Sequence, residues 1–145
     1  MYQNKMNIQF TSHSENEAFA RATVSAFLAQ LDPTIDQLYD IKMAVSEAVT
    51  NAIIHGYESD PTKQVHLMCE YKLEETQPPN IIIEITDFGQ GIVNIDEART
   101  ALFTTAGDAD RAGLGFTVME SVVDNVEVFS ELGKGTTVTL QKQLF

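Results

Sequence analysis

Residues 81–91 read IIIEITDFGQG, and this stretch decides the fold. Four isoleucines in five residues predict a buried β-strand, and the glycines at 89 and 91 predict a turn just after it. Such a strand places the carboxylate of Asp87 at the mouth of a sheet, where it could accept a hydrogen bond from an exocyclic amine such as that of adenine. An aspartate before glycine is also a common turn residue, so this stretch alone leaves both interpretations open.

The segments around this strand predict a chain of the order β-α-α-β-β-loop-α-β-β. Alternation of apolar and polar residues predicts strands, and helical spacing of apolar residues predicts helices. The expected strands are 6–10, 65–73, 81–85, 126–130 and 136–140; the expected helices are 14–30, 32–55 and 116–123, with a short one at 96–100. Because strands and helices come in blocks, we expect an α+β domain over residues 1–145, with a mixed, largely antiparallel sheet covered by helices on one face.

Local signals set the expected ends of these elements. Ser14 and Glu17 have the spacing of a capping box at the start of the first helix. Asp32 followed by Pro33 predicts the start of the second helix, and Gly56 predicts its end. The sequence QPPN at 77–80 predicts a hairpin loop between two strands.

Composition excludes several classes of protein. The net charge of −12 argues against nucleic acid as a direct ligand, because phosphate contacts need Lys and Arg, and it suits either a basic protein partner or simple solubility. No apolar run approaches the ~20 residues that span a membrane. The N-terminus lacks the features of a signal peptide, and the single Cys69 allows no internal disulfide. We therefore expect a cytoplasmic protein.

Three polar side chains follow the second predicted helix at intervals of four residues. Glu47, Asn51 and His55 form a stripe that borders the apolar face of this helix. The amide oxygen of Asn51 suits Mg²⁺, and the carboxylate of Glu47 suits the removal of a proton from an attacking hydroxyl. A polar stripe on a solvent-facing helix would look the same, so this alternative stays open.

A second glycine pair lies at the start of the last predicted helix. Gly113 and Gly115 could offer backbone N–H groups to phosphate, although the motif is not a Walker A sequence. The fork of Arg111 could reach a terminal phosphate, and Thr136 could lend a hydroxyl. A linker into a core helix, a surface charge and an ordinary strand threonine are the respective alternatives.

Four motifs in this order resemble those of the GHKL superfamily, which includes gyrase, Hsp90, MutL and histidine kinases. SEAVTNAIIHGY (46–57) resembles the N-box, DFGQGI (87–92) the G1 box, RAGLGF (111–116) the G2 box, and GKGT (133–136) the last glycine motif. The chain is most similar to the small serine kinases that act as anti-sigma factors, those of sporulation in particular. That likeness rests on SENEAFARATVSAFLAQLDPT (14–34), LFTTAGD (102–108) and GLGFTVME (113–120).

The resemblance implies a Bergerat ATP-binding fold, an α/β sandwich, with ATP or ADP and Mg²⁺ as ligands. Glu47 would be the catalytic base, Asn51 would ligate Mg²⁺, and Asp87 would read the adenine amino group. Residues 94–111 would form a lid over the phosphates. The residues implied around the nucleotide are Asn51, His55, Asp87, Gly89, Gly91, Ile92, Thr104, Thr105, Arg111, Gly113, Leu114, Gly115, Phe116 and Thr136.

The resemblance also implies a homodimer that binds a sigma factor and phosphorylates a serine of an anti-anti-sigma factor, with Arg21 facing a partner. The alternatives are a stress-response anti-sigma kinase, a clamp ATPase of the gyrase or Hsp90 type, the catalytic half of a histidine kinase, and a nucleotide-gated binder. The chain is short for a clamp ATPase, and no helix with a phosphoacceptor histidine precedes the N-box. Glu47 argues against a binder without catalysis.

Overall fold

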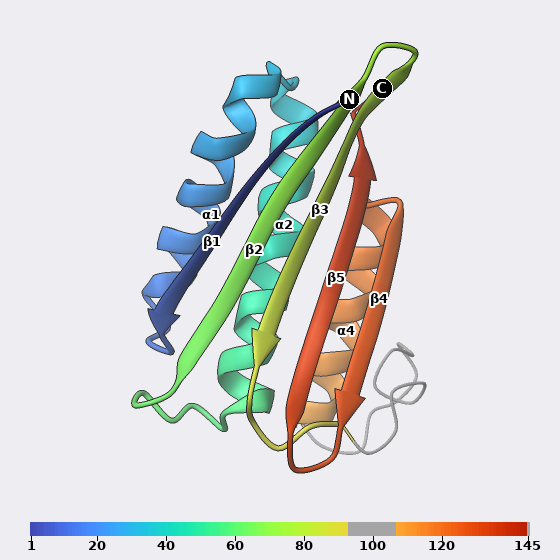
Figure 1. The fold of residues 1–145 in the computed structure, drawn as a ribbon. Coiled ribbons are helices and arrows are strands. Elements are labelled where there is room, and N and C mark those ends of the chain that lie inside the picture. The colour runs from blue at the N-terminus through green and yellow to red at the C-terminus, as the bar shows by residue number, and fades with distance from the viewer. Residues whose placement is uncertain (93–106, 145) are drawn as a thin grey trace.

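One five-stranded sheet, covered by helices on one face, forms the computed structural model (Figure 1), which describes residues 1–92 and 107–144. The strand order is β1-β2-β3-β5-β4, and each pairing between these described strands is antiparallel. The expected largely antiparallel sheet is thus confirmed. The strands are β1 (Tyr2–Thr11), β2 (Gln64–Glu74), β3 (Gln77–Asp87), β4 (Asn125–Glu131) and β5 (Gly135–Gln143).

The helices lie on a single side of this sheet (Figure 1). They are α1 (Asn16–Leu28), the 3₁₀ turn η1 (Ala29–Leu31), α2 (Ile35–Asn51), the π-helical turn η2 (Ala52–Gly56) and α4 (Gly107–Val122). For residues 107–114 only the backbone is described. None of the described helices combines the length and the apolarity needed to cross a membrane.

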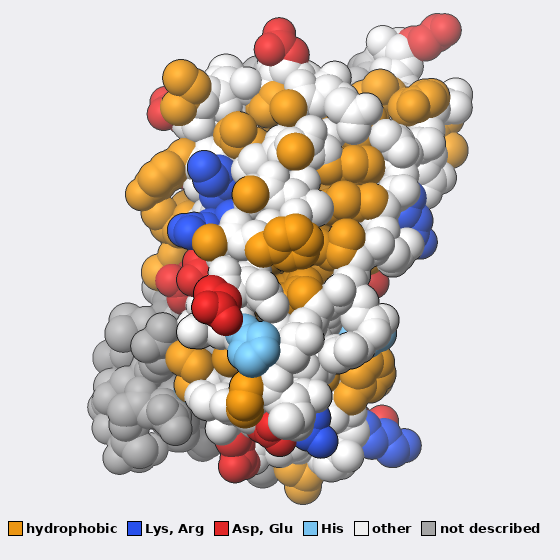
Figure 2. Space-filling model, turned by 90° about the vertical axis from the view of Figure 1, so that its left-hand side faces the viewer, with side chains coloured by type: hydrophobic (Ala, Val, Ile, Leu, Met, Phe, Trp, Pro, Cys, Tyr) orange, Lys and Arg blue, Asp and Glu red, His pale blue; other side chains and the backbone are white. Residues whose placement is uncertain are grey.

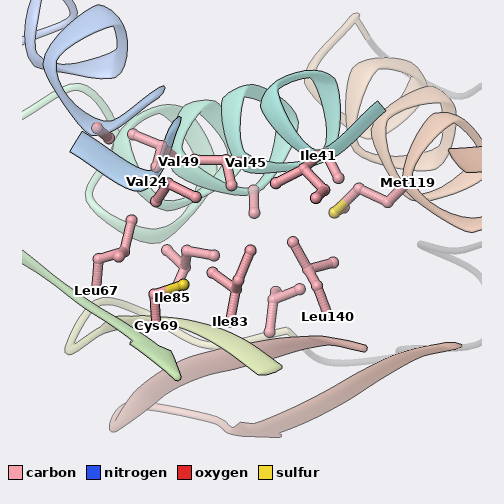
Figure 3. Close-up of a cluster of buried hydrophobic side chains, with 14 of the residues drawn as sticks. Val24, Ile41, Val45, Val49, Leu67, Cys69, Ile83, Ile85, Met119 and Leu140 are labelled. Atoms are coloured by element: carbon pink, nitrogen blue, oxygen red, sulfur yellow. The ribbon is translucent and has the colours of Figure 1, made fainter. Parts of the chain in front are cut away.

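The core lies between α2 and the middle of the sheet (Figure 3). Alternate residues of β2 and β3 point inward, among them Cys69, Ile83 and Ile85, and meet Val45 and Val49 of α2. Burial of each such aliphatic side chain contributes about 1.5–3 kcal/mol. The same burial raises the pKa of the Cys69 thiol to about 12, so Cys69 stays a neutral core residue.

The predicted starts of α1 and α2 were wrong in their capping residues. No side chain caps the start of α1; the Ser14 carbonyl accepts the Glu17 N–H at 3.2 Å instead. At α2, Thr34 and Gln37 form the capping box, with bonds of 3.1 and 2.9 Å. Asp32 cannot cap α2, because its left-handed φ of 52° ends η1, whereas an N-cap residue is extended.

The predicted hairpin loop at 77–80 was also wrong. The turn is Glu75–Thr76, and Pro78 and Pro79 belong to β3. Proline fits there because β5 pairs with β3 only from Asn80 onward, and the β2–β3 ladder is irregular between Lys72 and Glu74. The missing proline N–H groups therefore break little of the sheet.

The end of α2 prepares the functional site. The α-helix itself ends at Asn51, and the chain continues as the wider π-helical turn η2 from Ala52 to Gly56. Such π turns are often found at functional sites, because they turn side chains away from the regular spacing. Here η2 brings His55 and Gly56 against the end of β3, where Gln90 donates its side-chain N–H to the His55 carbonyl at 2.7 Å.

Candidate functional site

A cavity of about 170 Å³ opens beside the end of α2. The end of β3, the start of β5 and α4 form its other sides. It is smaller than the roughly 300–1,000 Å³ usual for a drug-sized ligand, so it suits one part of a larger molecule, such as a flat ring. The wall is mostly apolar, with a few polar groups. It consists of Ala48, Asn51, Ala52, His55, Gly56, Ile85, Asp87, Gln90, Gly91, Ile92, Phe116, Thr136 and Val138.

Asp87 is the buried acid of this cavity, only 5% exposed. Its Oδ1 accepts the Gly89 N–H at 2.9 Å, and the Thr136 backbone also forms a hydrogen bond with the carboxyl group. Burial outweighs these two bonds and raises the pKa of Asp87 to about 6. At neutral pH the carboxylate is therefore ionised but poorly solvated, which favours a ligand that donates a hydrogen bond.

Three glycines let the backbone close tightly around Asp87. A Cβ at Gly56 would lie 2.5 Å from the Asp87 Cγ, and one at Gly135 would lie 2.1 Å from the Asp87 carbonyl oxygen. A Cβ at Gly89 would lie 1.8 Å from the Gly56 carbonyl oxygen. Gly89 does not line the cavity, although we expected it beside the ligand. It is needed instead for contact between two backbone segments.

We expect Gly89→Ala to lower the free energy of unfolding by about 3 kcal/mol or more, since the new Cβ would collide with backbone atoms of Gly56, which cannot move aside as the end of a flexible side chain could. Gly133→Ala is the control: its Cβ would meet nothing within 4 Å, but its φ of +80° is left-handed. Only about 1–2 kcal/mol of backbone strain should follow there. Urea titrations of both variants measure the two losses. Equal losses would contradict the contact at Gly56.

Asn51 is a second unusual polar residue of the cavity. It is 7% exposed, and among the side chains and backbone that the structure describes, no partner bonds to its Oδ1 or Nδ2. A buried polar group without a partner costs about 1–3 kcal/mol, so both amide atoms are available to a ligand. Glu47 lies one helical turn earlier and is half-buried.

Gly115 brings the bare backbone of α4 to these two side chains. A Cβ at this position would lie 3.1 Å from the Asn51 Nδ2 and 3.2 Å from the Glu47 Oε2. Any larger residue at 115 would crowd the space in front of the acid and the amide. Glu47, Asn51 and Gly115 therefore meet at one place beside the cavity.

The predicted start of the last helix was wrong. The helix α4 begins at Gly107 and not near Phe116. The amides of Gly113, Gly115 and Phe116 therefore lie inside a helix, where they bond to carbonyls of the preceding turn. They can hold phosphate only if the first turns of α4 open. The predicted residues Thr104 and Thr105 lie outside the described residues, as do the side chains of Arg111 and Leu114.

The structure brings most of the described candidates together. Asn51, His55, Asp87, Gly91, Ile92, Phe116 and Thr136 line the cavity as a group. Sequence reasoning missed the other lining residues, although their spacing carried a signal. Ala48 and Ala52 precede and follow Asn51 on one helix face, and Ile85 and Val138 lie two residues from Asp87 and Thr136 on one sheet face. Gly56 and Gln90 had no such signal.

Arg21 lies apart from the cavity, in a surface hollow between α1 and α2. Its Nε is 3.5 Å from the Glu17 Oε1, and its side chain is 41% exposed. The hollow runs to the same Glu47 that faces Gly115, and it is lined by Glu17, Arg21, Tyr39, Lys42, Met43, Ser46 and Glu47. Glu47 thus stands between an open surface and the cavity.

Comparison with known protein families matches residues 10–142 to the histidine kinase-like ATPase domain. The chain therefore belongs to this family, and membership of it implies ATP binding. The chain is 53% identical over 141 residues to the anti-sigma F factor of Geobacillus thermodenitrificans, covering 97% of this chain and 93% of the relative. The anti-sigma F factor of Clostridium perfringens is 52% identical, with 97% of both chains covered. These relatives place the chain among the anti-sigma F factors of the family.

Solved structures share the fold at lower identity. The RsbU and RsbW domains of a Mycobacterium tuberculosis protein match with a TM-score of 0.66 and 22% identity, covering 97% of this chain and 32% of that one. A blue-light activated histidine kinase of Erythrobacter litoralis matches with a TM-score of 0.55 and 16% identity, covering 85% of this chain and 40% of that one. These matches support the sandwich fold alone.

Proposed function

We propose that this chain, acting as one domain over residues 1–145 in the cytoplasm, is an anti-sigma factor and an ATP-dependent protein-serine kinase. It would bind a sporulation sigma factor and phosphorylate a serine of an anti-anti-sigma factor. The observation that carries the kinase is the pair of Glu47 and Asn51 facing the bare backbone of Gly115, next to a cavity with a buried acid. The relatives named anti-sigma F factor support the binding of a sigma factor.

The cavity would hold the adenine ring of ATP. Asp87 is a buried acceptor for the exocyclic amine, and Ile85, Val138 and Phe116 supply apolar walls for the faces of the ring. The phosphates would then extend along α2 toward Asn51 and Glu47. The size of the cavity agrees with a site for the base alone.

Asn51 is the residue suited to hold Mg²⁺ with the phosphates. In the part of the chain that the structure describes, no cluster of three His, Cys, Asp or Glu could hold a metal by itself. A cation here would be held by the Asn51 amide oxygen, a hard ligand of the kind that Mg²⁺ binds, together with its bound nucleotide. When bound, Mg²⁺ would supply positive charge that neutralises the phosphates.

Glu47 would act as the base in the transfer itself. Its carboxylate takes the proton of the serine hydroxyl while the serine oxygen forms a bond to the γ-phosphorus. The bond from that phosphorus to the bridging oxygen breaks, and ADP leaves with the electron pair. Because Glu47 also borders the hollow with Arg21, a serine presented at the surface can approach it.

The side of the molecule formed by α1 and β1 is suited to binding a partner protein. Apolar side chains gather over this side (Figure 2). On β1, Met6 and Ile8 are partly buried; on α1, Phe27 is partly buried and Phe19 is half exposed. The strand β1 is an edge of the sheet, and its free backbone groups can pair with another chain. These features support the proposed homodimer and a contact through Arg21. The net charge of −12 suits a basic partner.

The deciding experiment incubates the chain with γ-labelled ATP, Mg²⁺ and a candidate anti-anti-sigma factor. We expect label on one serine of that partner, stable in acid, and none on the partner's serine-to-alanine variant. Acid-labile label on histidine would instead indicate a histidine kinase, and phosphate release without labelled protein would indicate an ATPase. Binding of a purified sigma factor is measured separately, so that the two halves of the proposal are tested independently.

We expect Asn51→Ala to separate folding from Mg²⁺ binding. The ligand-free variant should be as stable as the wild type or more stable, because two buried polar atoms without partners are removed. ADP binding by calorimetry should lose most of its dependence on Mg²⁺. Unchanged Mg²⁺ dependence would show that the ion is held elsewhere.

A further inference from the structure

Tyr57, the residue after η2, has a buried hydroxyl with two partners. The side chain is 7% exposed. Its hydroxyl donates to the Gln64 carbonyl at 2.6 Å and accepts the Phe88 N–H at 2.8 Å. Gln64 begins β2, and Phe88 directly follows Asp87. The ring thus reaches from the end of the helix layer into the end of the sheet.

The register of the sheet explains what this hydroxyl replaces. In the β2–β3 ladder His66 pairs with Thr86, and the same antiparallel register continued by two residues places Phe88 opposite Gln64. A regular ladder would join the Phe88 N–H directly to the Gln64 carbonyl. The Tyr57 hydroxyl stands between these two groups and satisfies both. It is a spacer that holds the strands apart where the ladder ends.

The position of this spacer matters because of Asp87. The Phe88 N–H and the Asp87 carbonyl belong to one planar peptide group, so the bond to Tyr57 fixes that plane. The next N–H, of Gly89, holds the Asp87 Oδ1. On the other side, the Asp87 backbone is held by its pairing with Thr136 of β5. The direction of the carboxylate therefore depends on how far β3 is held from β2.

We propose that Tyr57 is a positioning residue of the nucleotide site: its hydroxyl keeps β3 apart from β2 just after Asp87 and so aims the Asp87 carboxylate at the adenine amine. This inference rests on the proposed function, in which Asp87 reads adenine. Without the hydroxyl, the Phe88 N–H would move toward the Gln64 carbonyl, and the turn that carries the carboxylate would tilt. Tyr57 touches neither the reacting atoms nor, by this inference, the base.

The test compares ADP with purine riboside 5′-diphosphate, which has the same phosphates and lacks only the exocyclic amine. The ratio of the two dissociation constants reports whether the Asp87 carboxylate is oriented toward the exocyclic amine. A general loosening of the fold would weaken the binding of both ligands equally and leave the ratio unchanged. For the wild type we expect a ratio of about ten to one hundred, the range for a hydrogen bond to a charged group. For Tyr57→Phe we expect a ratio within about threefold of one.

Tyr71→Phe is the matched control. Tyr71 is also buried, at 3% exposure, and its hydroxyl accepts a hydrogen bond from the Asn4 side chain at 2.9 Å, near the start of β1. This variant should keep the wild-type ratio. A Tyr57→Phe protein that folds and keeps the wild-type ratio overturns the inference about Tyr57 alone. A wild-type ratio near one overturns the reading of adenine by Asp87 and the inference about Tyr57 that rests on it, whereas the labelling experiment tests the kinase separately.

Amide exchange in the wild type keeps the inference testable if Tyr57→Phe does not fold. We expect the Phe88 N–H of the ligand-free protein to exchange about as slowly as the amides inside β3, because the buried hydroxyl holds it. Exchange at the rate of an exposed loop amide would show that the bond to Tyr57 is absent and would overturn the inference.

Discussion

Glu47→Gln should lower phosphoryl transfer to the partner serine by about 10²- to 10⁴-fold, the usual contribution of a general base. The amide has nearly the shape of the carboxylate, but it cannot take a proton. Nucleotide binding should persist, because Glu47 does not line the cavity that would hold the base. Sigma-factor binding should persist as well. Single-turnover transfer with labelled ATP, together with ADP titrations by calorimetry, measures the two effects.

Glu74→Gln is the control for the removal of one negative charge, since Glu74 is exposed at the far end of β2. It should leave transfer unchanged. If Glu47→Gln keeps more than about a tenth of the wild-type rate, Glu47 is not the essential base, because the loss would fall below the range for this role. The hollow between α1 and α2 would then not be the place where the partner serine meets its base.

The fold could be predicted because its signals are local and repeat along the chain. Strand alternation in 65–73 and the isoleucine run before Asp87 indicated the centre of the sheet, and the order of the described elements matches the expected one. The short helix expected at 96–100 lies outside the described residues. The errors lie at element ends, where nonlocal contacts decide. Pro78 and Pro79 entered β3 because only one neighbouring strand pairs there, and α4 extended back to Gly107 through residues whose polar sequence suggested a loop.

The site could be predicted only where residue type signals chemistry. Asp87, Asn51 and Thr136 carry oxygens that suit the contacts of a nucleotide, and the structure places all three around one cavity. Gly56 could not be assigned from the sequence, because its role depends on how closely η2 approaches Asp87. The bridging hydroxyl of Tyr57 was hidden for the same reason: the sequence does not show that it replaces a ladder bond.

Asp87→Asn should make the ligand-free protein more stable at pH 7 and bind nucleotide less well. Burial raises the pKa of Asp87 from 3.8 to about 6, so the folded state binds more protons than the unfolded state between these pH values. The free energy of unfolding of the wild type therefore falls as pH rises from about 4 to about 6, and the loss is complete at pH 7. A rise of about two pKa units corresponds to about 3 kcal/mol.

Asparagine has no such titration, and its Oδ1 can still accept the Gly89 N–H. The stability gain of Asp87→Asn should thus be absent below about pH 4, grow through the window up to pH 6, and reach at most about 3 kcal/mol at pH 7. Urea unfolding of both proteins at several pH values measures it. A constant difference across this range would show that burial of the charge is not its cause.

The same ionisation should govern the choice of base in the wild type. When Asp87 is protonated, the oxygen that carries the proton cannot accept a hydrogen bond from the adenine amine. The preference for ADP over purine riboside 5′-diphosphate should therefore decline as pH falls below about 6. In Asp87→Asn the preference should be small at every pH, with ADP binding about 10- to 100-fold weaker at pH 7. An acid that destabilises the ligand-free fold is retained, on this account, because its unsatisfied charge is what selects adenine. A wild-type preference that ignores pH between 5 and 8 would exclude Asp87 as the group that reads the base.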